Sequence, residues 1–151
     1  MSLQSKQSGF TLIEMMIVIA ITAILSSIAI PNYLTWLPKS RLNGAARQVM
    51  GDLMAARMKA ISLNHRVKVF FYSNYQYRIC DDADNNGTVT NGEGDVQPGD
   101  IQSEYSDVTF SATADPIFYP RGTALGSTIT LINSSGSADV KVAITGRVKI
   151  E

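Results

Sequence analysis

One uninterrupted apolar run near the start of the chain constrains its fold more than any other feature. Residues 10–30 form a run of 21 residues with a single charged side chain, Glu14, and no further charge follows until Lys39. As a helix rising ~1.5 Å per residue, this run would be about 30 Å long, close to the hydrocarbon thickness of a bilayer. The sequence therefore predicts one membrane-spanning helix. Because a charge in such a helix is costly, we expect Glu14 to have a function.

The residues that precede and include this carboxylate resemble a known signal. A short polar leader containing Lys6 leads to Gly9, and residues 10–14 read Phe-Thr-Leu-Ile-Glu. This arrangement resembles the class III signal of type IV pilins and type II secretion pseudopilins. The resemblance implies that a prepilin peptidase cleaves between Gly9 and Phe10, that Phe10 is then N-methylated, and that Glu14 pairs with a neighbouring subunit's N-terminus during assembly. A paired carboxylate is far less costly in an apolar environment than an unpaired one.

These features predict three segments along the chain. Residues 1–9 form the leader, residues 10–38 form the transmembrane and filament-core helix, and residues 39–151 form a globular pilin-like domain. Proline lacks the backbone N–H that a helix needs, so we expect Pro31 to bend the helix and Pro38 to break it a second time.

The globular segment has the pattern of an α+β fold. Between residues 40 and 63, apolar residues recur at spacings of three and four, which predicts an amphipathic helix with one buried stripe. The stripe consists of Leu42, Ala45, Ala46, Val49, Leu53, Ala56, Ala60 and Ile61. A β-hairpin is predicted at residues 67–72 and 75–80. Weaker strands are predicted at residues 108–111, 116–119, 127–132, 139–144 and 147–150. We therefore expect a long N-terminal helix packed on an antiparallel β-sheet.

The C-terminal half adds a narrower resemblance. Residues 118–122 read Phe-Tyr-Pro-Arg-Gly, and residues 146–149 read Gly-Arg-Val-Lys. With the strands between them, these residues resemble the FimT/GspH family of minor pilins and pseudopilins. Secretion pseudopilins of this type are minor parts of a short periplasmic pseudopilus. FimT-like minor pilins are similar to proteins that bind DNA in natural transformation, where a C-terminal Gly-Arg-x-Arg motif contributes.

A DNA site of that kind would use basic residues near the C-terminus. The candidates are Arg147 and Lys149, with Arg121 and Lys141 as further contributors. Lys149 occupies the position of the second arginine of the motif. A lysine keeps the positive charge but lacks the forked hydrogen-bonding geometry of the arginine guanidinium group. Phosphate neutralisation alone suffices for binding that is independent of base sequence. Ordinary solvated charges on a surface strand are the alternative.

Carboxylates are concentrated in one segment, the acidic loop at residues 81–107. Residues 79–107 contain eight acids and no lysine or arginine, so the rest of the chain has 13 − 8 = 5 acids against 13 bases. The neutral total therefore conceals a local excess of negative charge beside a basic remainder.

Residues 82–93 within this loop match the spacing of an EF-hand calcium loop. Oxygen ligands would come from Asp82, Asp84, Asn86, the carbonyl of Thr88, Thr90 and Glu93. Gly87 occupies the sixth position, where the chain must turn sharply. The flanking residues predict strand and loop instead of helices, so the sequence predicts a structural Ca²⁺ site without an EF-hand domain. A solvated acidic loop is the alternative.

No grouping typical of catalysis accompanies these motifs, and the sequence predicts a protein that is not an enzyme. The single cysteine, Cys80, lies in a predicted strand and is expected in the core, and no motif places His65 beside it. One cysteine also excludes the intrachain disulfide that closes a C-terminal loop in many major pilins.

Three functions are compatible with these features. The first is a structural minor subunit of a type IV pilus or a type II secretion pseudopilus. It would be a single-pass protein of the bacterial inner membrane with its domain in the periplasm, and would then join other pilin or pseudopilin subunits. The second is DNA capture by a FimT-like minor pilin. The third is a membrane-anchored calcium-binding adhesion module that does not polymerise.

Overall fold

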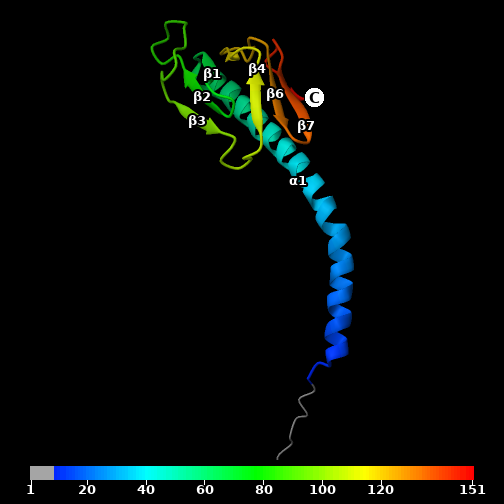
Figure 1. The fold of residues 1–151 in the computed structure, drawn as a ribbon. Coiled ribbons are helices and arrows are strands. Elements are labelled where there is room, and N and C mark those ends of the chain that lie inside the picture. The colour runs from blue at the N-terminus through cyan, green and yellow to red at the C-terminus, as the bar shows by residue number, and fades with distance from the viewer. Residues whose placement is uncertain (1–8) are drawn as a thin grey trace, which may run out of the picture. The chain divides into compact units, whose positions relative to one another are not determined.

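The computed structural model describes residues 9–151, and residues 1–8 of the predicted leader lie outside the described residues. The described chain contains one helix and eight strands (Figure 1). It divides into two compact units, of which the first ends at Trp36 and the second extends from Leu37 to Glu151. This division falls two residues before the predicted boundary between residues 38 and 39.

Helix α1 extends from Leu12 to Leu63 and contains both Pro31 and Pro38. The predicted break at Pro38 is therefore wrong, whereas the bend at Pro31 stays a prediction. A proline within a helix removes one backbone hydrogen bond. Ending the helix there and starting a second one would lose several backbone hydrogen bonds, so the continuous helix is favoured. The hydroxyl of Thr35 donates to the carbonyls of Pro31 (3.3 Å) and Asn32 (2.9 Å), which adds local hydrogen bonds between the two prolines.

The second half of α1 carries the buried stripe that its spacing predicts. Seven of the eight predicted residues are buried, namely Leu42, Ala45, Ala46, Val49, Leu53, Ala56 and Ala60. Ile61 is the exception, at 42% exposed. It directly follows the buried Ala60, and successive residues are about 100° apart around the helix axis, so Ile61 lies beside the buried face. The helix ends at Leu63, and Asn64 follows in the left-handed conformation (φ 55°) typical of a helix C-terminus.

The strands form two four-stranded sheets in which every pairing is antiparallel. The first sheet has the order β3-β2-β1-β5, with β1 (Val67–Phe71), β2 (Gln76–Asp81), β3 (Gln97–Asp100) and β5 (Ile117–Phe118). The second has the order β4-β6-β7-β8, with β4 (Thr109–Ala112), β6 (Ser127–Asn133), β7 (Gly136–Val142) and β8 (Val148–Ile150). The α+β fold is confirmed, with two sheets in place of one.

Each of the seven predicted strands overlaps an observed strand, and one observed strand was not predicted. The hairpin of β1 and β2 has the expected antiparallel register, with Val67 opposite Asp81 and Phe71 opposite Tyr77. The unpredicted strand is β3, whose sequence Gln-Pro-Gly-Asp lies inside the acidic loop and has no strand pattern. Pairing with β2 makes it a strand, and its proline is tolerated because β3 lies at the edge of the sheet.

One buried cluster joins α1 to both sheets. It includes Leu53 of α1, Tyr77 of the first sheet and Ile129 of the second. The hydroxyl of Tyr77 donates a hydrogen bond to Oδ2 of Asp52, which ties the first sheet to the helix. Cys80 is fully buried, as predicted. This packing fixes the strands from which the candidate sites extend.

Candidate functional sites

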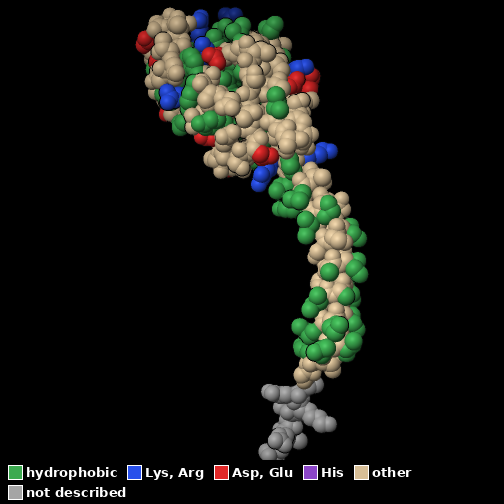
Figure 2. All heavy atoms as spheres, viewed as in Figure 1, with side chains coloured by type: hydrophobic (Ala, Val, Ile, Leu, Met, Phe, Trp, Pro, Cys, Tyr) green, Lys and Arg blue, Asp and Glu red, His purple; other side chains and the backbone are tan. Residues whose placement is uncertain are grey.

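The first candidate site is the exposed apolar segment at residues 10–36. Every large apolar side chain in it is solvent-exposed, including Phe10 at 87% and Trp36 at 59%, and Figure 2 shows hydrophobic side chains along the visible face of this part of the helix. By length and composition, α1 is able to cross a membrane. An exposed apolar surface of this extent indicates contact with lipid or with other protein surfaces.

Glu14 belongs to a capping box at the beginning of α1. The backbone N–H and the hydroxyl of Thr11 both donate to Oε2 of Glu14, at 2.8 and 2.9 Å, and the Glu14 N–H donates to the Thr11 hydroxyl at 3.3 Å. Ser/Thr-x-x-Glu is the sequence signature of this reciprocal cap, so the role of Thr11 was readable from the sequence. Both bonds end on Oε2, and the described residues place no donor on Oε1 of Glu14.

The second candidate site is a basic groove of about 530 Å³ on the second sheet. Three of the four predicted DNA-contacting residues line it together: Lys141, Arg147 and Lys149. Lys141 and Lys149 are direct cross-strand partners on β7 and β8. Gly146 makes the turn before β8 with φ 77°, and a Cβ atom there would collide with the carbonyl of Gly122. Glycine at this place in the motif therefore has a steric reason.

Two features of the groove were not foreseen from the sequence. The carboxylate of Glu151 forms ion pairs with both Lys141 and Lys149, so it offsets part of the positive charge. Arg121 does not line this groove. It lines a second groove with Arg66 and Tyr119, so three of the four predicted residues share one groove and Arg121 does not.

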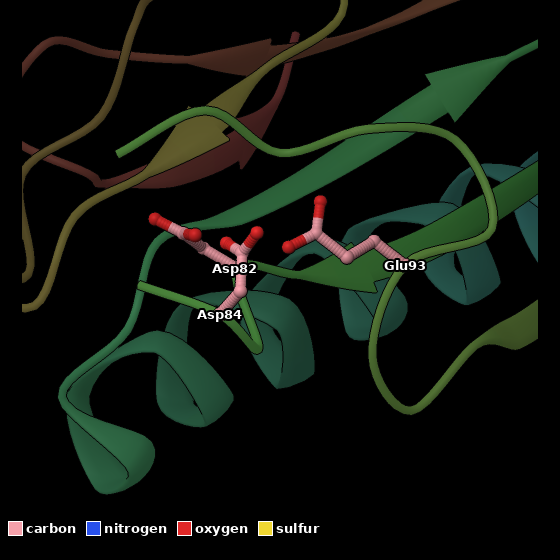
Figure 3. Close-up of side chains that lie close together, drawn as sticks. All are labelled: Asp82, Asp84 and Glu93. Carbon is pink, nitrogen blue, oxygen red and sulfur yellow. The ribbon is translucent and has the colours of Figure 1, made fainter. Parts of the chain in front are cut away.

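The third candidate site is the predicted calcium loop. Asp82 follows β2 directly and is 1% exposed, whereas Asp84 is exposed and Glu93 is partly buried. One carboxylate oxygen from each of the three lies within 4.8 Å of the others, and Figure 3 shows the three side chains lying close together. A hydrogen bond from the backbone N–H of Asn86 lowers the pKa of Asp84, and the pair is exposed to solvent.

The other predicted ligand positions lie in the same loop, with mixed orientations. Asn86 donates its side-chain amide to Asp84 at 2.7 Å and accepts the Thr88 N–H at 2.7 Å, while Thr90 donates its N–H and hydroxyl to Glu93 at 2.8 and 2.9 Å. Gly87 has φ 87°, as a sharp turn at the sixth position requires. The structure therefore brings all three carboxylates together, with Asn86 and Thr90 hydrogen-bonded to them.

The acidic loop is held to the helix by one lysine that sequence inspection did not single out. Nζ of Lys59 lies 3.0 Å from Oδ1 of Asp81 and 3.2 Å from Oδ2 of Asp95, and also donates to the Asp95 carbonyl at 2.6 Å. Asp95 donates its N–H to Asp81 at 2.9 Å. These contacts join the two ends of the 82–93 segment to α1. No local pattern predicts them, because Lys59 and Asp95 are 36 residues apart.

Comparisons with known proteins agree with both halves of this architecture. The prokaryotic N-terminal methylation motif matches residues 4–30, and the family of the type II transport protein GspH matches residues 45–146. The second match covers more than half of the chain and includes every strand except β8. The chain belongs to the GspH family of type IV pilin-like proteins. Pilins of this fold are structural proteins.

Individual relatives are also pilins. A fimbrial protein of Dichelobacter nodosus is 34% identical over 140 residues, which cover 86% of this chain and 78% of the relative. Fimbrial protein Q of Moraxella bovis is 49% identical over 51 residues, 34% of this chain and 30% of that protein. The type IV minor pilin FimU of Pseudomonas aeruginosa has a similar structure, with a TM-score of 0.58 at 16% identity, covering 75% of this chain and 90% of FimU. At that identity the likeness to FimU concerns the fold.

Proposed function

We propose that this GspH-family protein is a minor subunit of a type IV pilus or a type II secretion pseudopilus, held in the bacterial inner membrane by residues 10–36 until assembly. The observation that carries the proposal is the fully exposed apolar segment with Glu14 as its only charged side chain. Lipid covers this apolar surface before assembly, and the equivalent helices of neighbouring subunits pack against it afterwards. The globular domain lies on the periplasmic side.

The capping box suggests how Glu14 serves both states. Within one chain, Thr11 satisfies Oε2 of Glu14, so the helix can begin in the membrane without an unpaired carboxylate. Oε1 remains able to accept a hydrogen bond from the positively charged N-terminus of an adjacent subunit. Burial of that ion pair in the filament core would set the register between subunits, because displacement would leave both charges without partners.

The decisive experiment compares Glu14→Gln with wild type in cells that assemble the filament. We expect equal membrane-fraction levels, and an amount in sheared filaments that is at least about tenfold lower, since a lost buried ion pair exceeds the ~1.4 kcal/mol that tenfold represents. Glu104→Gln, a change of the same kind on an exposed acid of the domain, is the control. Equal recovery of Glu14→Gln in filaments would refute the register role. Absence of the wild type from filaments would favour a module that does not polymerise.

Processing of the leader is a separate part of the proposal. A prepilin peptidase would cut between Gly9 and Phe10, and methylation of the new N-terminus would follow. Mass spectrometry of the purified protein tests both steps: we expect an N-terminal peptide that begins with N-methylated Phe10. A mature protein that keeps residues 1–9, or that is cut elsewhere, would contradict this assignment.

A second candidate function, DNA capture by a FimT-like minor pilin, rests on the convergence of Lys141, Arg147 and Lys149 in one groove. Cations at these positions suit the phosphate backbone of DNA independently of its sequence. Three phosphate contacts would give a slope of about −3 for log K against log salt concentration. Partial neutralisation by Glu151 limits the affinity.

Matched charge changes test the groove as a DNA site. In filter-binding assays with duplex DNA, Arg147→Ala should weaken binding and reduce the salt slope by about 1. Glu151→Gln should strengthen binding because it frees two lysines. Arg121→Ala, which removes the same charge outside the groove, should have no effect. Equal weakening by Arg121→Ala and Arg147→Ala would show that the groove is not the binding site.

A further inference from the structure

We infer that residues 82–93 form a structural calcium site, with Asp82, Asp84 and Glu93 as its charged ligands. The inference concerns the domain alone and does not depend on filament assembly. The sequence supplies an oxygen ligand at each ligand position of a twelve-residue calcium loop. The structure adds that three of these side chains, from positions up to 11 residues apart, place carboxylate oxygens within 4.8 Å of one another.

The ionic environment of these carboxylates supports the inference. The ion pairs of the acidic loop involve acids outside this cluster: Lys59 binds Asp81 and Asp95, and Arg41 binds Asp107. In the described part of the chain, no lysine or arginine nitrogen lies within 4.0 Å of a carboxylate oxygen of Asp82, Asp84 or Glu93. Three clustered negative charges without a cation repel one another. A divalent cation supplies the missing positive charge.

A buried orphan oxygen points to a ligand independently of the clustering. Oε1 of Glu93 has essentially no solvent-accessible area and accepts no hydrogen bond from the described residues, whereas Oε2 accepts two from Thr90. A buried carboxylate oxygen without water or a donor is costly. In Figure 3 the carboxyl group of Glu93 faces Asp82 and Asp84. The twelfth position of a calcium loop supplies both oxygens of a glutamate to the ion, so coordination would satisfy Oε1.

The burial of Asp82 adds a second constraint. Its side chain is 1% exposed, and its two oxygens accept the N–H groups of Asn86 (3.0 Å) and Gly87 (2.9 Å). These bonds leave further lone pairs on each oxygen for a cation. The other groups of the loop, the Asn86 amide and the Thr90 hydroxyl, now donate to Asp84 and Glu93. When calcium binds, the Asn86 amide would rotate so that its oxygen faces the ion, and its hydrogen bond to Asp84 would be lost.

Calcium fits this donor set better than magnesium or zinc. Every donor is an oxygen, which excludes a preference for zinc. Calcium accepts six to eight oxygens in flexible geometry, including a bidentate glutamate, whereas magnesium demands a nearly ideal octahedron. The expected effect is structural: the ion would fix the segment between β2 and β3, whose ends Lys59 already joins to α1.

The test uses the full-length chain in dodecyl maltoside. Isothermal titration should show one Ca²⁺ per chain with a Kd of about 10⁻³ M or tighter, and 2 mM CaCl₂ should raise the Tm by about 2 °C or more over EDTA. Glu93→Gln keeps an acceptor for Thr90 and should weaken Ca²⁺ binding at least about tenfold. Glu104→Gln, at an exposed acid of the same loop, should bind as wild type does.

Three results would overturn the inference. They are absence of Ca²⁺ uptake at millimolar concentration, equal uptake by wild type and Glu93→Gln, and an equal response to Mg²⁺. Asp84→Asn provides a second variant, because Asp84 is exposed and its replacement leaves the core intact. If this variant also binds Ca²⁺ as wild type does while remaining folded by circular dichroism, the cluster is not the site.

Discussion

At the scale of single residues, the contact between Tyr77 and Asp52 shows how a polar group is accommodated in the core. The Tyr77 side chain is 2% exposed, and its hydroxyl donates to Asp52 of α1. Burial raises the pKa of Tyr77 well above its usual range, and the hydrogen bond to the Asp52 carboxylate adds to the shift. The phenol is therefore held in its neutral form, as a donor that links the helix to the first sheet.

We predict that Tyr77→Phe lowers the free energy of unfolding of the domain by about 1–2 kcal/mol at pH 7, through loss of a hydrogen bond to a charged acceptor. Above the ordinary tyrosine pKa of about 10, the unfolded chain loses this proton while the folded chain keeps it. Wild-type stability should then fall by up to ~1.4 kcal/mol per pH unit relative to the variant. Urea unfolding at pH 8 and pH 10.5 tests this: a difference that stays constant or grows contradicts it.

At the scale of elements, the buried face of α1 carries several small side chains that pack in the same core cluster as both sheets. Ala45, Ala46 and Ala60 are 0% exposed, and Ala56 is 1% exposed. The periodicity predicted which face of the helix is buried. It did not show how tightly that face is packed, because packing depends on strands from distant parts of the chain.

Two adjacent alanines provide a matched test of this packing. Ala56 is buried and Ala55 is exposed, so both changes to leucine add the same volume at neighbouring positions. We predict that Ala56→Leu destabilises the domain by about 1–3 kcal/mol through overpacking, whereas Ala55→Leu changes stability by less than about 0.5 kcal/mol. Thermal unfolding followed by near-UV circular dichroism measures both. Equal effects would mean that the interface has room for the added atoms.

Two ion pairs between α1 and the acidic loop differ in burial and should differ in energy. The side chains of Lys59 and Asp81 are 13% and 7% exposed, whereas those of Arg41 and Asp107 are 39% and 29% exposed. Lys59→Met should cost about 3 kcal/mol because it leaves a buried carboxylate without its cation. Arg41→Met should cost less than about 1 kcal/mol. Urea unfolding of both variants at low and moderate salt distinguishes them, and a Lys59→Met loss no larger than that of Arg41→Met would contradict the assignment.

At the scale of the whole molecule, the division at Trp36 separates a part with no buried side chain from a part with its own core. All residues from 9 to 36 are exposed, while the buried cluster begins at Leu42. Stability of the domain is therefore expected to come from residues 37–151 alone. In the proposed function, lipid or other subunits would cover the exposed half of the helix.

We predict that a chain lacking residues 1–36 folds and remains soluble, because the deletion removes the exposed apolar surface and no member of the core. Its near-UV circular dichroism and Tm should match those of the domain in the full-length protein in detergent, within about 3 °C, which for a chain of this size is about 1 kcal/mol. Sedimentation should show a monomer. Aggregation, or a Tm lowered by more than about 10 °C, would show that the membrane segment stabilises the domain.

The calcium loop shows how far a sequence pattern reaches. The spacing of Asp82, Asp84 and Glu93 predicted a common ligand, and the structure gathers their carboxylates. The loop's neighbours were not predictable. Strand β3 exists because it pairs with β2, and Lys59 of α1 contacts Asp81, which follows it by 22 residues in the sequence. In the same way, the sequence grouped Arg121 with the C-terminal basic residues, whereas in the fold it lines a different groove.

The sequence by itself determined the apolar helix with its internal carboxylate, the buried stripe, the main hairpin and the ligand spacing of residues 82–93. These features depend on local periodicity or on short motifs, so they can be read without knowing which distant residues are in contact. The tertiary structure decided the continuity of α1 through Pro38, the division of the strands into two sheets, and the opposition of Glu151 to Lys141 and Lys149. Each of these features depends on contacts between residues that are far apart in the sequence, and no local pattern specifies such partners. Packing and long-range pairing outweigh the conformational preference of any single residue.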